Sequence, residues 1–171
     1  MQNYEFKSRK EYVKWVLSQE ELKEIALHDE NLETRIEALE KITDQEFLKE
    51  IALHAYTLDE MCEAISRIED EDILIEVATE SLDGQVAIEA LEKITDQEFL
   101  KERALHAYTL DEMCEAISRI EDEDILIEVA TESSDELVAI EAMKKLPKER
   151  IKEIKSKSWY IKAVCKDILS Q

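Results

Sequence analysis

Five glutamates recur at intervals of 26 residues and are the most regular set of ionisable side chains in the chain. Each is followed four positions later by a lysine or an arginine. This order favours an ion pair within a helix, whereas a column of carboxylates on helices stacked about 8–10 Å apart could bind a cationic partner. Both interpretations stay open for these candidate partner-binding residues, which are Glu37, Glu63, Glu89, Glu115 and Glu141.

Histidines, cysteines and clustered acids are the other side chains that could bind a metal ion or react. The histidines hold equivalent positions about 10 Å apart, too far to share one metal ion with ligands at about 2 Å. The cysteines lack CxxC spacing and are predicted to be small buried hydrophobic residues. The acidic runs 69–72 and 121–124 lack the glycine of a calcium loop and are predicted to start helices. No catalytic, metal or cofactor site is therefore expected at His28, His54, His106, Cys62, Cys114 or Cys165.

The composition favours an all-helical protein. The 171 residues include one glycine and one proline, and 43 acidic residues face 22 basic ones, for a net charge of −21. Such an acidic chain is not expected to bind nucleic acid directly, because that binding rests on neutralising phosphates. Residues 1–15 and 144–171 carry +2 and +6, and the stretch between them carries −29. No apolar run has the length of a membrane span and no signal-peptide pattern is evident, so we expect a cytoplasmic protein without membrane contact.

An internal duplication relates residues 39–90 to residues 91–142 without gaps. The two copies differ only at Ile51/Arg103, Leu82/Ser134, Gly84/Glu136 and Gln85/Leu137. A shorter period of 26 residues lies beneath the duplication and is typical of a solenoid. Arg103 replaces an isoleucine of an apolar stripe. We expect it either to lay its stem along apolar surface and pair with nearby acids, or to bind a partner.

Candidate N-cap residues divide each 26-residue unit into two helices of about ten residues. Apolar residues in each helix fall on one stripe, and alanines recur at the same positions from unit to unit. Helices of this length are marginal alone and must gain stability by stacking on neighbouring units. The expected N-caps are Ser18, Asn31, Asp44, Thr57, Asp70, Asp83, Asp96, Thr109, Asp122 and Asp135.

The first helices of the units carry a second column of acids, for which the sequence shows no regular basic mate. This column is predicted to be a solvated, strongly negative face that favours solubility. It comprises Glu24, Glu50, Glu76, Glu102 and Glu128.

These patterns predict one all-α solenoid domain over residues 1–171. A capping helix is expected within residues 1–17, and five two-helix repeats are expected over residues 18–146. A degenerate repeat over residues 147–171 is expected to close the array, with Pro147 near the start of its first helix.

The repeat resembles the HEAT-like and armadillo-like α-solenoids, particularly those with short repeats that occur in many bacterial proteins. The resemblance is carried by a recurring Ile-x-Asp turn, such as Ile42 and Asp44, followed by Leu-x-x-x-Ala, such as Leu48 and Ala52. The arginine that such families often place in the second helix occurs here as Arg35 alone. The resemblance implies a right-handed superhelix of antiparallel helix pairs that binds proteins, and it carries over no catalytic residue.

Repetition and acidity favour a non-enzymatic scaffold that binds a basic protein or peptide. One alternative is an acidic neutraliser of a nucleic-acid-binding protein, such as an immunity protein or a DNA mimic, because a negatively charged rod imitates a polyanion. A third hypothesis is an enzyme or lyase built on a HEAT-like scaffold. The sequence leaves the oligomeric state open.

Overall fold

The computed structural model describes residues 12–15, 18–154 and 158–170, and the described part is helical with no strand. The chain divides into two compact units, Met1–Ala90 and Leu91–Gln171, at the junction between the duplicated copies. The helices are α2 (Gln19–His28), α3 (Leu32–Leu39), α4 (Gln45–His54), α5 (Leu58–Arg67), α6 (Glu71–Glu80), α7 (Gly84–Leu91), α8 (Gln97–His106), α9 (Leu110–Arg119), α10 (Glu123–Glu132), α11 (Glu136–Lys145), α12 (Lys148–Ile151) and α13 (Trp159–Ser170).

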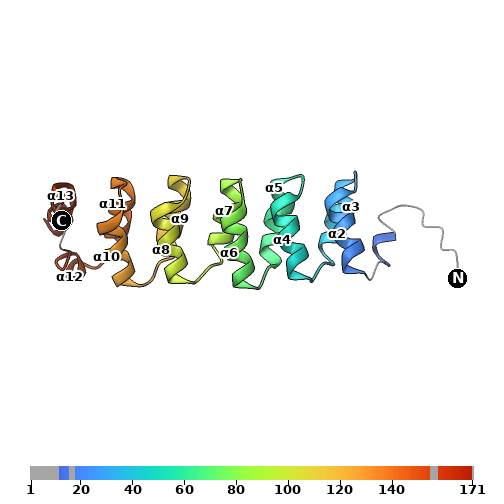
Figure 1. Ribbon diagram of the computed structural model, residues 1–171, viewed down its shortest axis with the longest axis horizontal. Coiled ribbons are helices and arrows are strands. Elements are labelled where there is room, and N and C mark those ends of the chain that lie inside the picture. The colour runs from blue at the N-terminus through green and yellow to red at the C-terminus, as the bar shows by residue number, and fades with distance from the viewer. Residues whose placement is uncertain (1–11, 16–17, 155–157, 171) are drawn as a thin grey trace. The chain divides into compact units, whose positions relative to one another are not determined.

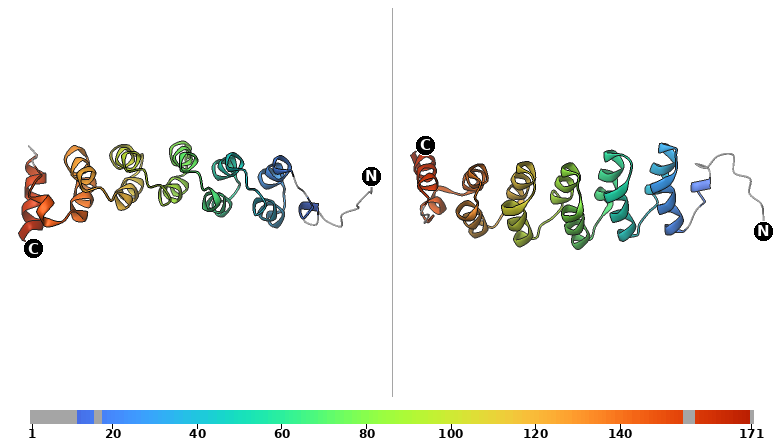
Figure 2. Two further views of the ribbon diagram at one scale, coloured as in Figure 1. Left: turned by 90° about the horizontal axis from the view of Figure 1, so that it is seen from below. Right: turned by 45° about the horizontal axis from the view of Figure 1, so that its top comes forward.

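Each unit is a helical-repeat solenoid made of two layers (Figures 1 and 2). In the first unit, α2, α4 and α6 pack side by side in one layer, while α3 and α5 belong to the other. In the second unit, α8, α10 and α12 form one layer, and α9, α11 and α13 form the other. The first helix of a repeat pairs with the second across a short turn, as the 13-residue spacing of the capping residues predicts.

All ten predicted N-cap residues cap their helices. In each case a side-chain oxygen accepts a hydrogen bond from a main-chain N–H of the first helical turn. The side chain of Asp83, for example, accepts from the N–H of Gln85 at 2.8 Å. These bonds satisfy donors that a helix start leaves unpaired, and they fix where each helix begins.

The core between the layers is lined by the recurring alanines, whose small side chains allow neighbouring helices to approach closely. All ten are at most 3% exposed: Ala26, Ala38, Ala52, Ala64, Ala78, Ala90, Ala104, Ala116, Ala130 and Ala142. The isoleucines of the Ile-x-Asp turns are also fully buried, and these are Ile42, Ile68, Ile94 and Ile120. Burial of this stripe supplies the stability that the short helices lack alone.

A glutamine at the start of some first helices clamps the turn that leads into the next repeat. The Oε1 atom of Gln45 accepts from the main-chain N–H groups of Glu69 (2.7 Å) and Asp70 (3.3 Å). Gln97 makes the same pair of bonds 52 residues later, and Gln19 makes them one repeat earlier. Because the clamp engages main-chain atoms, it joins consecutive repeats whatever side chains the turn carries.

The two ends of the array depart from the regular repeat. At the amino end, Tyr12 and Val13 are helical and Val13 is fully buried, while the rest of the predicted capping helix lies largely outside the described residues. At the carboxyl end, Pro147 precedes the single turn of α12, and α13 has twelve residues. Within the described residues, no helix combines the length and apolar character that a membrane span requires.

We predict that Gln45→Leu lowers the free energy of unfolding by about 1–3 kcal/mol, because two main-chain donors lose their acceptor. Gln45→Glu is expected to cost less, because it keeps an acceptor and glutamate stands at the equivalent positions 71 and 123. Urea unfolding followed by circular dichroism measures both effects.

Gln85→Leu serves as a matched control, because Gln85 is exposed and the second copy carries leucine at the equivalent position 137. Equal stability of Gln45→Leu and Gln85→Leu would rule out the clamp as a stabilising contact.

Candidate functional site

The five recurring glutamates lie on the second helices of the repeats, as the sequence predicts, but they differ in exposure. Glu63 on α5 is exposed, whereas the others are half-buried. One carboxylate oxygen of Glu37 is buried without a hydrogen-bond partner among the described residues. Three of the five belong to the first unit and two, Glu115 and Glu141, to the second. Glu63 is therefore the member most open to a partner.

The expected ion pairs between these glutamates and the cation four residues later are wrong for three repeats. Lys41 donates instead to the carbonyl of Val13 at 2.7 Å. Arg67 donates to the carbonyls of Glu40 and Ile42 at 2.9 and 3.0 Å. Arg67 thus turns towards the carboxyl end of α3, the second helix of the preceding repeat, where unpaired carbonyls and the helix dipole attract positive charge.

Lys145 in the second unit follows the same rule. Its ammonium group donates to the carbonyls of Ile117 (3.0 Å), Ser118 and Ile120 (2.8 Å), and burial lowers the pKa of Lys145. Glu141 pairs with Lys144 instead, at 2.6 Å. Lys41, Arg67 and Lys145 thus bind main-chain carbonyls of preceding elements instead of the glutamates four residues before them, and the carboxylate of Glu63 stays exposed.

Three of the five acids in the first-helix column, Glu50, Glu76 and Glu128, have a basic mate that the sequence interpretation did not include. The mate is a lysine of the preceding repeat, which bridges two carboxylates. Lys23 contacts Glu20 at 3.1 Å and Glu50 at 3.0 Å. Lys101 contacts Glu98 at 2.6 Å and Glu128 at 3.0 Å, and Lys49 joins Glu46 and Glu76 in the same way. Hydrogen bonds to these carboxylates raise the pKa of all three lysines.

A buried ion pair joins α3 and α5. The Nε of Arg35 lies 2.7 Å from Oε1 of Glu60, and its Nη2 lies 3.3 Å from Oε2. Arg35 also donates to the carbonyl of Asp29, and the hydroxyl of Thr57 donates to Glu60. Glu60 is 3% exposed, and its hydrogen bonds raise the pKa of Arg35. The Glu60 carboxylate thus accepts from the Thr57 hydroxyl and from the Arg35 guanidinium. The main-chain N–H of Glu60 donates to Oγ1 of Thr57 at 3.3 Å, which is the N-cap bond of α5.

Arg103 supplies the counter-charge for the buried carboxylate of Glu112, the duplicate of Glu60. The residue that stands before Glu112 as Arg35 stands before Glu60 is Ala87, so Glu112 lacks that guanidinium. Arg103, which replaces Ile51, places Nη2 at 2.6 Å from Glu112, and both side chains are largely buried. Pairing with a nearby acid is thus the alternative that the geometry favours for Arg103. The signal in the sequence consists of two features, the alanine at position 87 and the arginine at position 103.

A groove of about 320 Å³ lies between α3 and α5 above this ion pair. Leu32 and Ile36 on α3 are 47% and 38% exposed and form its apolar side. Leu39 forms a buried part of the wall. The opposite side comes from the start of α5, and the complete lining is Leu32, Ile36, Leu39, Glu40, Thr57, Asp59, Glu60 and Glu63.

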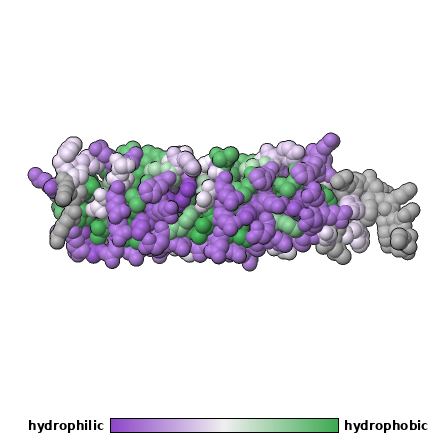
Figure 3. All heavy atoms as spheres, in the orientation of Figure 1, coloured by the Kyte–Doolittle hydropathy of each residue, from purple (hydrophilic) through white to green (hydrophobic). Residues whose placement is uncertain are grey.

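The rim of the α3–α5 groove is acidic. Glu40, Asp59 and Glu63 are exposed around it, whereas the charge of Glu60 is balanced by Arg35. The exposed ring of Tyr56, which the Arg35 guanidinium faces at 5.1 Å, stands on the adjoining turn. In the view of Figure 3, hydrophilic side chains cover most of the visible surface, and apolar patches interrupt them. An apolar floor with a carboxylate rim suits a segment that carries both apolar and basic side chains.

The histidines, the cysteines and the clustered acids are the remaining sequence candidates. No group of three or more His, Cys, Asp and Glu side chains is arranged to hold a metal ion in that part of the chain. The three cysteines form no disulfide bond and are half-buried, and burial raises the pKa of the Cys114 and Cys165 thiols. No family model, curated protein or solved structure matches the chain.

We predict that Arg103→Ile, which restores the residue of the first copy, destabilises the protein by about 3 kcal/mol, because it leaves the Glu112 carboxylate buried without a counter-charge. The double variant Arg103→Ile with Glu112→Val is expected to regain most of that loss, since valine stands at the equivalent positions 86 and 138. Thermal and urea unfolding measure both. A neutral single variant, or a double variant no better than the single one, would contradict this account of Arg103.

Proposed function

We propose that this protein is a non-enzymatic interaction scaffold and that the α3–α5 groove binds a basic, amphipathic segment of a partner protein. The observation that carries the proposal is the apolar side of Leu32 and Ile36 facing an acidic rim. We also propose kinship with the short-repeat HEAT-like solenoids, on the repeat motifs, and a cytoplasmic location, which fits three cysteines without a disulfide bond.

Binding is expected to rest on an apolar anchor with charges around it. Leu32 and Ile36 lie one turn apart on α3, so one face of a ligand helix contacts both. Exposed ion pairs contribute little binding free energy alone. Glu40, Asp59 and Glu63, however, surround a groove from which a bound ligand would exclude water. The carboxylates therefore select a basic ligand, and the apolar contacts hold it.

The neutraliser of a nucleic-acid-binding protein ranks second among our hypotheses. It requires columns of free carboxylates that imitate phosphates. The first-helix lysines Lys23, Lys49 and Lys101 each bridge two carboxylates, which lowers the free negative charge of that face. The groove supports the peptide-binding hypothesis more directly.

The probe for this proposal is a synthetic amphipathic helix with leucine on one face and lysine on the other. Its binding is measured by fluorescence anisotropy at low and high salt. We expect Glu63→Lys to weaken binding about tenfold at low salt, which corresponds to about 1.4 kcal/mol. Ile36→Asp should weaken it at both salt concentrations, because it removes the apolar anchor.

Glu80→Lys is the matched control, because Glu80 is an exposed glutamate of the same unit that does not line the groove. Equal weakening by Glu63→Lys and Glu80→Lys would show that the peptide senses net charge alone, and the proposed site would be wrong.

A further inference from the structure

The terminal helix α13 begins earlier than the 26-residue period predicts. Continuation of that period would place its N-cap at residue 161, but the N–H of Ile161 already points to the side chain of Ser158 at 3.4 Å, and α13 begins at Trp159. The apolar face of α13 nevertheless keeps the period, because Cys165 and Leu169 stand where α11 has the buried Ala139 and Met143.

Leu169 stands where the other second helices bury a large apolar side chain. The equivalent residues are at most 2% exposed, and they are Leu39, Ile65, Leu91, Ile117 and Met143. Leu169 is only partly covered, and Lys166 beside it is exposed. The face that closes the core in internal repeats is thus partly open in the last one.

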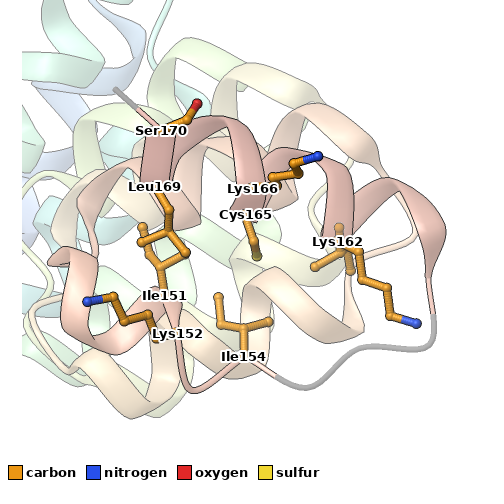
Figure 4. A pocket seen from close by; sticks show the side chains of 9 residues that line it. Ile151, Lys152, Ile154, Lys162, Cys165, Lys166, Leu169 and Ser170 are labelled. Carbon is orange, nitrogen blue, oxygen red and sulfur yellow. The ribbon is translucent and has the colours of Figure 1, made fainter.

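A groove of about 400 Å³ lies between α12 and α13 beside this lysine. Figure 4 shows the side chains of Ile151, Ile154, Cys165 and Leu169 gathered between the helices. Ile151 is buried, while the other three are only partly covered. The groove therefore offers apolar surface that the described part of the chain leaves open.

The rim of the α12–α13 groove is basic, unlike the rest of the protein. Lys152, Lys162 and Lys166 line it, are exposed, and extend their ammonium groups away from the apolar centre in Figure 4. The nearby acid Glu153 pairs with Arg150 at 2.5 Å. Residues 144–171 carry +6 in a chain of net charge −21.

We propose that the α12–α13 groove docks an acidic amphipathic helix of a partner protein. Its apolar residues would cover Ile154, Cys165 and Leu169, and its carboxylates would pair with the lysine rim. This site is independent of the α3–α5 groove and has the opposite charge preference. A protein with both sites joins two partners of opposite charge.

The test uses the full chain and a labelled synthetic helix with leucine at positions i, i+4 and i+7 and glutamate at most others. We expect the variant Lys162→Glu with Lys166→Glu to weaken binding at least about tenfold in anisotropy measurements at low salt. Leu169→Asp should weaken it at low and high salt. Lys144→Glu is the control, because Lys144 is exposed outside the groove, and it should bind within about twofold of the parent protein.

Cys165 supplies a second readout that does not depend on the charge variants. Saturating peptide should slow the alkylation of Cys165 by iodoacetamide at least about fivefold, because a docked helix covers the thiol. Cys114, which does not line the groove, should keep its rate. Circular dichroism of each variant confirms that the fold is retained.

Absence of binding to the parent protein, equal binding by the charge-reversed variant, or an unprotected Cys165 would each overturn the proposal. A dimer of the peptide-free protein that Lys166→Glu dissociates would show that a second copy occupies the groove, and it would overturn the assignment to a partner protein. Competition by the leucine-lysine peptide would show that the two grooves are not independent.

Discussion

The shortness of the helices is the constraint on which the rest of this structure depends. Helices of eight to ten residues form few internal hydrogen bonds for the entropy they lose, so they need help at both ends and along one face. Capping side chains serve the amino ends, cations of the next repeat serve several carboxyl ends, and buried alanines let the layers approach. The recurring N-caps, cations and alanines of the sequence serve these three purposes.

A buried charge limits how freely such repeats can be copied. Glu60 is tolerated because Arg35 reaches it from the preceding repeat. The copy 91–142 contains the equivalent carboxylate, Glu112, but residue 35 lies outside the duplicated segment, so no equivalent arginine precedes Glu112. Arg103 supplies the missing charge from within the same repeat. One of the four differences between the copies thus has a direct electrostatic reason.

The sequence predicts the local features of this protein well and the contacts between repeats poorly. All ten N-caps and the buried alanines follow from residue type and spacing, because both depend on a single helix and its stripe. The targets of Arg67 and Lys23 did not follow, since the sequence order favours partners within a helix and the chosen partners lie on neighbouring repeats. The α3–α5 groove also escaped prediction, because it depends on how far two second helices stand apart.

The clamp glutamines and the cations at the helix ends share one property: their partners are main-chain atoms. Every repeat offers the same N–H and C=O groups at its turn, so such a contact needs one suitable side chain, whereas a side-chain pair such as Arg35 with Glu60 needs two matching residues. Junctions that include main-chain contacts therefore tolerate the gain or loss of whole repeats better than junctions that rest on side-chain pairs alone. In this chain, the duplication of 52 residues with four changes is a record of that tolerance.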